Sequence, residues 1–177
     1  MKTTQILIAG FGGQGVLFVG KFLAYKGLVQ DKQVSWLPSY GPEMRGGTCN
    51  CSVIISDSPV GSPIITTPDV LIAMNLPSLQ KFVNDVVPGG KILIDSTLIY
   101  AKVERTDVEV FYIPATQMAK DAGFATLSNM VLLGKVLKES DAVSFEGNKE
   151  TLETFIPAKK ANLIDVNCQA LQTGYDF

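Results

Sequence analysis

The fold is decided near the amino terminus, by the segment QILIAGFGGQG at residues 5–15. The segment begins with a short, continuous apolar run, Ile6 to Ala9, which is typical of a parallel strand buried on both faces. It continues as Gly10 to Gly15, which matches the pattern G-x-G-x-x-G, and a helix is expected from about Gly15 to Leu28. A strand, a glycine-rich turn and a helix in this order indicate an α/β sheet of the nucleotide-binding type.

The rest of the chain continues this alternation of strands and helices. Strands are expected at about residues 33–37, 48–56, 69–75, 91–95 and 108–113, and helices at about 77–87, 116–123, 127–139, 149–155 and 158–173. The sequence therefore predicts an α/β fold, a three-layer α/β/α sandwich with a mostly parallel, Rossmann-like central sheet and a helical carboxyl-terminal segment. Because the 177 residues contain no linker and no repeat, we expect a single domain over residues 1–177.

The composition excludes several classes of protein. Fifteen Lys and Arg residues stand against 17 Asp and Glu, and this net charge of -2 predicts no binding to nucleic acid or to an anionic membrane. No apolar stretch reaches the roughly 18 residues that a membrane-spanning helix needs, and the run at residues 6–9 is too short for a secretory leader. The chain has no histidine, which excludes Ser-His-Asp and Cys-His catalysis by this chain and histidine-ligated zinc or haem.

The three cysteines, Cys49, Cys51 and Cys168, imply no disulfide framework and fit a reducing, cytoplasmic location. They are too few for a four-cysteine iron–sulfur cluster. Cys49 and Cys51 are two positions apart on a predicted strand, so their side chains share a face. We interpret them as buried, inert thiols, with a metal or redox pair as the alternative. Cys168 falls in a predicted helix and is assigned to packing.

The glycine-rich turn favours an anion, because the following helix presents free N–H groups and the positive end of its dipole. A nicotinamide or flavin site also needs an acid at the end of the second strand. The second strand ends Ser35-Trp36-Leu37-Pro38, so it has no acid at its end. Asp31 lies before the strand, on the wrong side for this role. Three interpretations stay open: contact with a phosphate or another anion, binding of NAD or FAD, and glycines that serve strand–helix packing alone.

A second distinctive segment is the loop Gly41-Pro42-Glu43-Met44-Arg45-Gly46-Gly47. Arg45 places a planar cation beside two glycines that allow close approach, which suits a phosphate or a carboxylate. The alternative is a salt bridge between Arg45 and Glu43 that stabilises an irregular loop.

Several single residues have both a structural and a functional interpretation. Asp95 ends a strand, where open α/β sheets bind ligands, but we favour a hydrogen-bonded cap for the following turn. Asn75 also follows a strand and is a candidate for the rim of a site. We assign Asn129 to the start of a helix and Trp36 to core or interface packing. Lys159 and Lys160 are assigned to a solvated face.

The sequence resembles the gamma subunits of 2-oxoacid:ferredoxin oxidoreductases in five segments that occur in the same order. These segments are Gly10–Gly15, Gly41–Gly47, Asp69–Asn75, Pro88–Gly90 and Asn129–Gly134. The resemblance covers about residues 4–134. It implies separate alpha and beta partner chains, often with a ferredoxin-like delta chain, which carry thiamine diphosphate and iron–sulfur clusters. The family oxidises a 2-oxoacid with coenzyme A to an acyl-CoA and carbon dioxide, and ferredoxin accepts the electrons.

By this resemblance the chain is a subunit of an enzyme, with no catalytic residue, no metal ligand and no tightly bound cofactor of its own. It implies that the chain lines the coenzyme A cavity, and its candidate residues there are Gly12, Gly13, Gln14, Gly15, Arg45, Gly46 and Gly47. The wording of the motifs suggests 2-oxoglutarate as the substrate, with pyruvate, 2-oxoisovalerate and indolepyruvate as alternatives. Two other functions stay open, namely a free-standing Rossmann-like reductase and a pure scaffold subunit.

Overall fold

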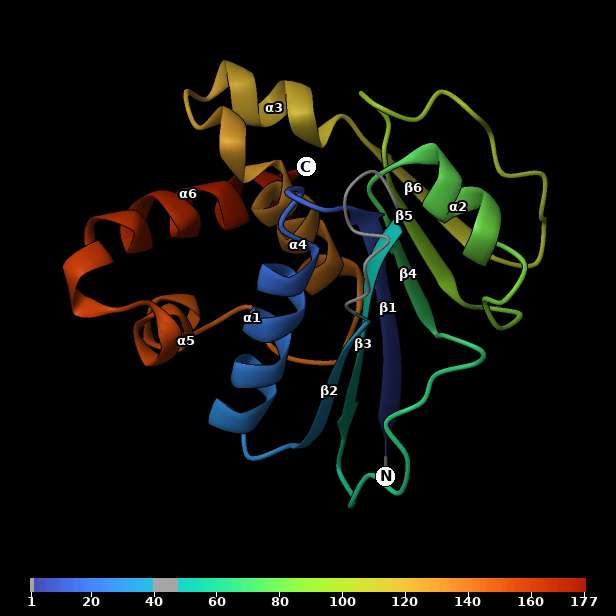
Figure 1. Cartoon of the computed structure of the whole chain (residues 1–177), viewed down its shortest axis with the longest axis horizontal. Helices are drawn as coiled ribbons and strands as arrows, with labels where there is room; N and C mark the ends of the chain where they lie inside the picture. Colours follow the sequence, from blue (N-terminus) through green and yellow to red (C-terminus); the bar gives the residue numbers. More distant parts are fainter. Residues whose placement is uncertain (1, 40–47) are drawn as a thin grey trace.

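The computed structural model, which describes residues 2–39 and 48–177, contains one six-stranded sheet in the order β2-β3-β1-β4-β5-β6. Helices lie on either side of this sheet (Figure 1). The strands are β1 (Thr3–Phe11), β2 (Gln33–Ser39), β3 (Thr48–Ser56), β4 (Val70–Ala73), β5 (Lys91–Asp95) and β6 (Glu109–Ile113).

The sheet is mixed, with β3 as its one antiparallel strand among the described residues. β1, β4, β5 and β6 pair in parallel, and β3 runs antiparallel between β1 and β2. Five of the six strands therefore point the same way, which confirms the predicted mostly parallel sheet. The reversed strand was not predicted. β3 can pair antiparallel with β2 because the two strands are consecutive and a short connection suffices.

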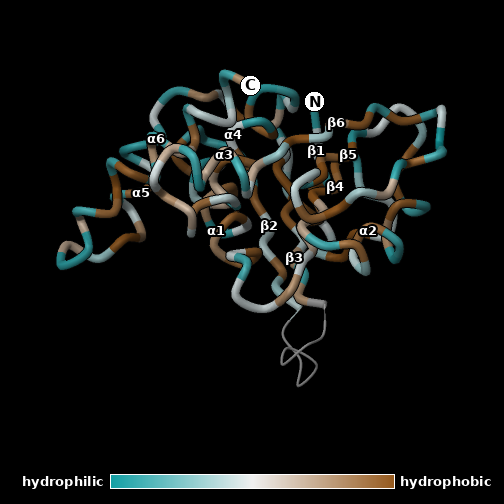
Figure 2. Tube along the Cα trace, turned by 90° about the horizontal axis from the view of Figure 1, so that it is seen from above, coloured by the Kyte–Doolittle hydropathy of each residue, from teal (hydrophilic) through white to brown (hydrophobic). Residues whose placement is uncertain are grey.

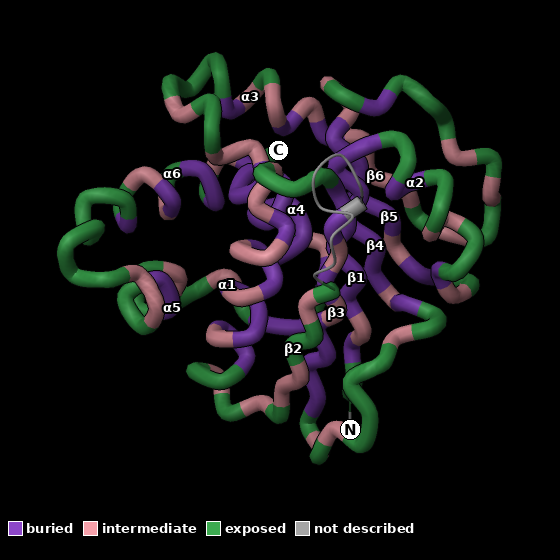
Figure 3. Tube along the Cα trace, viewed as in Figure 1, coloured by how far each residue is buried: buried purple, intermediate pink, exposed green. Residues whose placement is uncertain are grey.

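The carboxyl ends of the five like-directed strands lie together, at what we call the carboxyl edge of the sheet. Both faces of the central strands are covered. Ile6 and Ile8 point into an apolar cluster with α1 (Val16–Val29), α4 (Ser128–Glu139) and α6 (Asn162–Asp176). Leu7 points to the opposite face, which α2 (Leu76–Phe82) covers together with residues 86–103. This burial explains the continuous apolar run in β1. Figures 2 and 3 show the central strands as apolar and buried.

The remaining helices are α3 (Ala115–Asp121), η2 (Ala125–Leu127), α5 (Asn148–Phe155) and η3 (Ala158–Lys160). Several predicted boundaries differ from the structure: the helix expected at 158–173, for example, is divided into η3 and α6, and α6 ends at Asp176. Two other differences have a local reason. α2 stops at Phe82, where Val83, Asn84 and Asp85 follow, residue types that favour a helix interior less than alanine does. β2 continues through Pro38, which an edge strand tolerates because its outer N–H side needs no partner. In residues 2–39 and 48–177, no helix is long and apolar enough to cross a membrane.

The contact between α4 and α6 is a close approach of two backbones at two glycines. A Cβ atom on Gly134 of α4 would collide with the carbonyl oxygen of Leu171, and one on Gly174 of α6 would collide with that of Val131. Each helix therefore has a glycine where the other helix crosses it. The close crossing holds α4 in the core, where Figure 3 draws it as almost entirely buried.

We expect Gly134→Ala and Gly174→Ala each to lower the free energy of unfolding by about 1–3 kcal/mol or more, because the helices must move apart. Gly61→Ala is the control, since a Cβ there meets nothing within 4 Å. Urea denaturation measures all three variants. Equal stability of Gly134→Ala and Gly61→Ala would contradict the proposed backbone contact.

A buried lysine lies near the other end of α1. Lys26 is 0% exposed, and its Nζ donates a hydrogen bond to the carbonyl oxygen of Glu146 at 2.6 Å. Burial lowers the pKa of Lys26 from 10.5 to about 8, and the nearby carboxylate of Glu150 opposes the shift only in part. The native protein therefore releases this proton at a lower pH than the unfolded chain does.

Because the unfolded chain binds this proton more tightly, unfolding becomes less favourable as the pH rises from about 8 to 10.5. The free energy of unfolding should rise in this window by about 1.4 kcal/mol for each unit of pKa difference. Lys26→Met should lose this part of the pH dependence, whereas Lys120→Met, at an exposed position of α3, should keep it. Parallel pH-stability curves for wild type and Lys26→Met would refute the assignment.

Candidate functional site

The candidate site lies at the carboxyl edge, where the glycine turn follows β1. Asn75 follows β4 and Asp95 ends β5 at the same edge. Ser39 ends β2 there, and Thr48 of β3 pairs in register with Phe11. Open α/β sheets bind ligands at this edge, because the turns that leave parallel strands converge there.

The turn itself requires two glycines. Gly13 and Gly15 have φ angles of 94° and 78°, a left-handed conformation that strains any residue with a Cβ atom. The N–H of Gln14 closes the turn onto the carbonyl oxygen of Phe11 at 3.2 Å. Gly15 is the N-cap of α1, and no side chain caps that helix start. The first N–H groups of α1 therefore have no partner within the helix and can bind an anion.

The side chain of Gln14 ties the turn to β4. Its Oε1 accepts a hydrogen bond from the N–H of Phe11 at 2.6 Å, and its Nε2 donates to the carbonyl oxygen of Met74 at 2.9 Å. Asn75 continues the link, since its Nδ2 lies 3.5 Å from Gln14 Oε1 and its Oδ1 caps α2 by accepting from the N–H of Ser78. The Gln14 amide is thus engaged within the fold, which leaves the backbone of the turn as the part available to a ligand.

Asp95 is a structural cap, as predicted. Its Oδ1 accepts from the N–H of Thr97 at 3.1 Å, and its Oδ2 accepts from the hydroxyl of Thr116 at 2.6 Å. The carboxylate is 2% exposed and joins the end of β5 to the start of α3. Both oxygens accept hydrogen bonds from within the fold.

Asn129 brings α4 against the glycine turn. It lies in the first turn of α4, as predicted, and its Nδ2 is 3.5 Å from the carbonyl oxygen of Gly15. A Cβ atom on Gly15 would collide with this amide, so the glycine is needed for packing as well as for its backbone conformation. The sequence analysis did not place Asn129 and Gly15 together.

Arg45, Gly46 and Gly47 lie outside the described residues, as does Glu43. The structure describes the two residues that flank this segment, Ser39 before Tyr40 and Thr48 after Gly47. Both lie at the carboxyl edge, which is also where Gly12 to Gly15 lie. In the sequence, the segment that contains Arg45, Gly46 and Gly47 is therefore flanked by two residues that lie at the carboxyl edge, Ser39 and Thr48.

Cys49 and Cys51 are buried thiols, as predicted, and Cys168 is partly buried. Cys49 and Cys51 are 2% and 0% exposed on the same face of β3, and burial raises the pKa of both, that of Cys51 to about 12. Cys51 packs against α1 where Gly20 leaves room for its sulfur. Cys168 lies in α6, and burial also raises its pKa. Within the described residues no three Cys, His, Asp or Glu side chains are grouped as metal ligands.

Trp36 is 39% exposed on β2, at the position assigned to core or interface packing, and its indole lies beside Gly20 of α1. Lys159 and Lys160 are exposed in η3, as predicted for a solvated face.

The sequence analysis missed a cavity of about 380 Å³ beside the glycine turn. Gly15, Phe18 and Lys21 line it from α1, and Asn167 lines it from α6. Gly15, Phe18 and Lys21 follow one another at intervals of three residues, which indicates that they share one side of the helix. No local pattern in the sequence indicates that α6 lies opposite them. A larger hollow of about 610 Å³, between α2 and residues 101–105, contains none of the predicted site residues.

Comparison with known proteins gives matches along nearly the whole chain. The family described as pyruvate ferredoxin/flavodoxin oxidoreductase matches residues 5–177. The ketoisovalerate oxidoreductase subunit VorA of Methanothermobacter thermautotrophicus is 42% identical over 174 residues. That match covers 98% of this chain but 36% of the relative, so the chain spans about a third of the length of VorA.

The solved structures that share the fold include the following two. The gamma subunit of a keto/oxoacid ferredoxin oxidoreductase from Geobacter sulfurreducens has a TM-score of 0.81 at 29% identity, over 98% of this chain and 96% of that one. The 2-oxoglutarate:ferredoxin oxidoreductase of Magnetococcus marinus, solved with 2-oxoglutarate, coenzyme A and succinyl-CoA bound, has a TM-score of 0.89 at 25% identity. This second match covers 99% of this chain and 31% of that chain.

Replacement of Gln14 tests the link between the turn and β4. Gln14→Leu should lower the free energy of unfolding by about 1–3 kcal/mol, because the carbonyl oxygen of Met74 loses its donor in a buried position. Amide hydrogen exchange at Phe11 should become faster. Gln80→Leu, at an exposed position of α2, is the matched control and should change neither quantity. Unchanged exchange at Phe11 in Gln14→Leu would show that the amide does not hold the turn.

Proposed function

Because the chain belongs to the pyruvate ferredoxin/flavodoxin oxidoreductase family, we propose that it acts as the gamma subunit of a 2-oxoacid:ferredoxin oxidoreductase. The family that the sequence motifs suggested is thereby confirmed. The proposed reaction is the oxidative decarboxylation of a 2-oxoacid with coenzyme A, with transfer of the electrons to ferredoxin. The chain is one required part of this enzyme and is not catalytic alone. We also infer that residues 1–177 form one domain.

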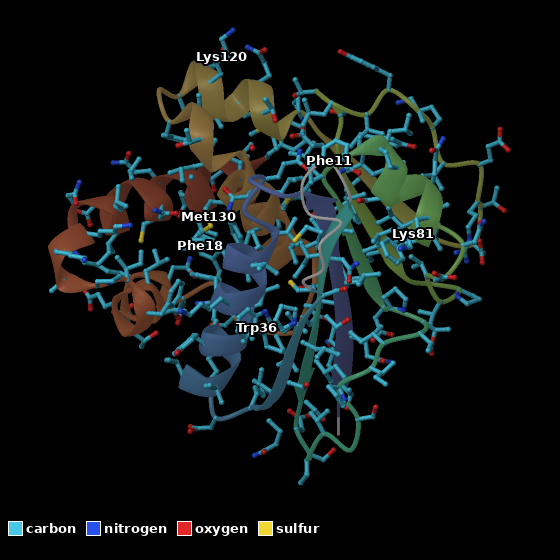
Figure 4. The ribbon with its side chains drawn as sticks, in the orientation of Figure 1. Phe11, Phe18, Trp36, Lys81, Lys120 and Met130 are labelled. Atoms are coloured by element: carbon cyan, nitrogen blue, oxygen red, sulfur yellow. The ribbon has the colours of Figure 1, made fainter. Side chains whose placement is uncertain are left out.

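One observation supports an assembled complex most directly. Five of the eleven large apolar side chains that stay exposed among the described residues lie within a few residues of the carboxyl ends of four strands. They are Phe11, Leu37, Leu76, Leu98 and Tyr100, with exposed fractions of 39%, 41%, 38%, 45% and 86%. Exposed apolar side chains grouped around a ligand-binding edge are typical of a surface that another protein covers. Figure 4 shows Phe11 at this edge, beside the glycine turn.

We propose that alpha and beta subunits cover this edge, and that a ferredoxin-like delta subunit completes the complex. Thiamine diphosphate and iron–sulfur clusters are assigned to those partners. The donor set of the described chain does not fit a cluster, since Cys49 and Cys51 face the core beneath α1. The proposal assigns no nucleic acid and no membrane as a partner. A cytoplasmic location fits the three unpaired thiols.

Coenzyme A is the proposed ligand of the carboxyl edge. The turn formed by Gly12, Gly13, Gln14 and Gly15 would bind one of its phosphates at the positive end of α1, through those N–H groups that have no partner within the fold. Arg45, with Gly46 and Gly47, would supply the planar cation for a phosphate. The solved Magnetococcus marinus enzyme, which holds coenzyme A, supports this choice of ligand.

Two substrates have support. The relative with 42% identity is named for ketoisovalerate, and the solved enzyme with 25% identity holds 2-oxoglutarate. The sequence motifs suggested 2-oxoglutarate, and a direct comparison of the two acids decides between them.

The test is reconstitution. The purified chain should show no turnover, and co-expression with its alpha and beta partners should produce coenzyme A-dependent reduction of a low-potential dye with one of these acids. In that complex, Arg45→Ala should raise the KM for coenzyme A by about tenfold or more, as expected for the loss of a charged hydrogen bond. The KM for the 2-oxoacid should not change.

Lys81→Ala is the control, because it removes an exposed cation from α2 (Figure 4). An unchanged KM for coenzyme A in Arg45→Ala would remove Arg45 from the cavity. Turnover of a 2-oxoacid by the chain alone would refute the proposed division between subunits. Tight binding of NAD(H) or FAD would instead support a free-standing reductase. An active reconstituted complex in which the Gly12–Gly15 turn contacts no ligand would support a scaffold role for this chain.

A further inference from the structure

The strand β6 is an open edge of the sheet. It pairs with β5 on one side, and no described strand lies on its other side. All of its residues except Ile113 are at least partly exposed. The strand reads Glu-Val-Phe-Tyr-Ile, in which every residue after the first is of a type enriched in strands. An edge of this kind can pair with a strand of another chain.

Two hydrogen bonds fix the direction of the backbone groups in β6. The N–H of Glu109 donates to the carbonyl oxygen of Gly90 at 2.9 Å. The carbonyl oxygen of Ile113 accepts from the N–H of Ser96 at 2.8 Å. Glu109 and Ile113 therefore bond toward β5, and alternate residues of a strand bond in opposite directions.

Val110 and Tyr112 are the residues whose backbone groups point the other way, out of the sheet. No described residue outside the sheet forms a hydrogen bond with the N–H or C=O group of either one. The outer edge of β6 thus presents an alternating row of donors and acceptors, which is the pattern that a further strand needs.

The opposite edge of the sheet is protected in a way that β6 is not. β2, at the other end of the sheet (Figure 1), contains Pro38, which has no N–H group to donate. Proline and lysine within an edge strand are common means of preventing strand pairing between chains. β6 contains neither, and its one charged residue, Glu109, is its first. The two edges therefore differ, and β6 is the one suited to pairing.

Apolar side chains extend this edge on the face toward α4 and α6. Phe111 is half-buried there, and Phe177, which follows α6, is 52% exposed. The Nζ of Lys135 lies 5.6 Å from the centre of the Phe111 ring and 5.8 Å from the centre of the Phe177 ring, so both rings lie near β6. Lys135 is paired with Glu139 at 2.8 Å, and the apolar patch therefore carries no unpaired charge from this lysine.

We propose that β6 pairs antiparallel with β6 of a second copy of this chain, about a two-fold axis that passes beside Phe111. In this register Val110 of each copy lies opposite Tyr112 of the other. Every outward N–H group of one copy then meets an outward C=O group of the other, so no backbone group of the edge is left without a partner. The sheet would continue across the interface from one copy to the next.

The side chains that would face one another favour a second copy as the occupant. Phe111 would lie opposite Phe111, and Val110 opposite Tyr112, which are aromatic and aromatic–β-branched pairs of the stabilising kind. Glu109 would lie opposite Ile113, so no like charges are opposed. A two-fold contact uses the same patch on both copies and closes at a dimer. This surface is separate from the carboxyl edge, so the proposal does not rest on the proposed subunit assignment.

Sedimentation velocity of the full chain at increasing concentration measures the equilibrium between monomer and dimer, and we expect a dimer. Amide hydrogen exchange, followed by NMR, should locate the contact. Protection of the N–H groups of Val110 and Tyr112 should rise with protein concentration. The N–H of Phe111, which points toward β5 in both states, should keep the same protection.

Replacement of Val110 tests the backbone pairing. Val110→Pro removes one outward donor from each copy but no bond to β5, and an edge strand tolerates proline at such a position. It should weaken the dimer by about tenfold or more, because each copy loses a hydrogen bond at the interface. Val110→Lys keeps the N–H group and should also weaken the dimer, since a lysine on an edge strand opposes pairing.

Two variants serve as matched controls. Val110→Thr keeps both the N–H group and a β-branched side chain, and should leave the dimer nearly as stable as that of the wild type. Gln33→Lys adds the same charge as Val110→Lys to an exposed position of β2, at the opposite edge, and should change nothing. Urea denaturation shows whether each variant is folded.

Three results would overturn the proposal. The first is a chain that stays monomeric up to about 1 mM. The second is a dimer that is equally stable in Val110→Pro and Val110→Lys, which would place the contact on another surface. The third is protection of Val110 and Tyr112 that appears only after alpha and beta chains are added, which would assign the edge to a strand of a partner subunit. The first two can occur whether or not the assembled complex reduces the dye, so failure here and failure of the proposed function can be told apart.

Discussion

The structure depends on how β1 leaves the centre of the sheet. Ile6, Leu7 and Ile8 are buried on alternating faces, so both faces of β1 are covered by other parts of the chain. The chain must then reverse into α1 within a few residues, and Gly13 and Gly15 permit this with positive φ angles. The Gln14 amide holds the reversal by bonding both to Phe11 and to Met74 of the adjoining segment. The position of α1 against the sheet follows from this turn.

This constraint limits what the carboxyl edge can do chemically. Its polar side chains are already engaged: Gln14 holds the turn, Asn75 caps α2, and Asp95 joins β5 to α3. What remains for a ligand is the set of N–H groups at the start of α1, which can bind charge but cannot transfer a proton. Such an edge is suited to position an anionic group for chemistry performed by other protein chains. The exposed apolar side chains around it agree with that division of work.

The helical layer adds a cavity next to the glycine turn. The glycines of α4 and α6 let these helices cross closely, and the crossing holds α4 so that Asn129 contacts the back of the turn at Gly15. α1 and α6 then enclose a cavity with amide and lysine side chains on its wall. Gly15 is common to both features, since it caps α1 at the edge and lines the cavity behind it. A single residue without a side chain therefore belongs both to the turn at the carboxyl edge and to the wall of the cavity.

The sequence by itself determined the elements and the local contacts. The strands at 48–56 and 91–95 were predicted at their observed bounds, and the cap at Asp95 and the buried thiols of Cys49 and Cys51 were predicted as found. These features depend on periodicity and on hydrogen bonds between near neighbours in the chain. Tertiary structure alone decided the reversed β3, the bond from Gln14 to Met74, and the contact between Asn129 and Gly15, which are 114 positions apart. Packing selects such partners from the whole chain, so no local pattern of residues identifies them.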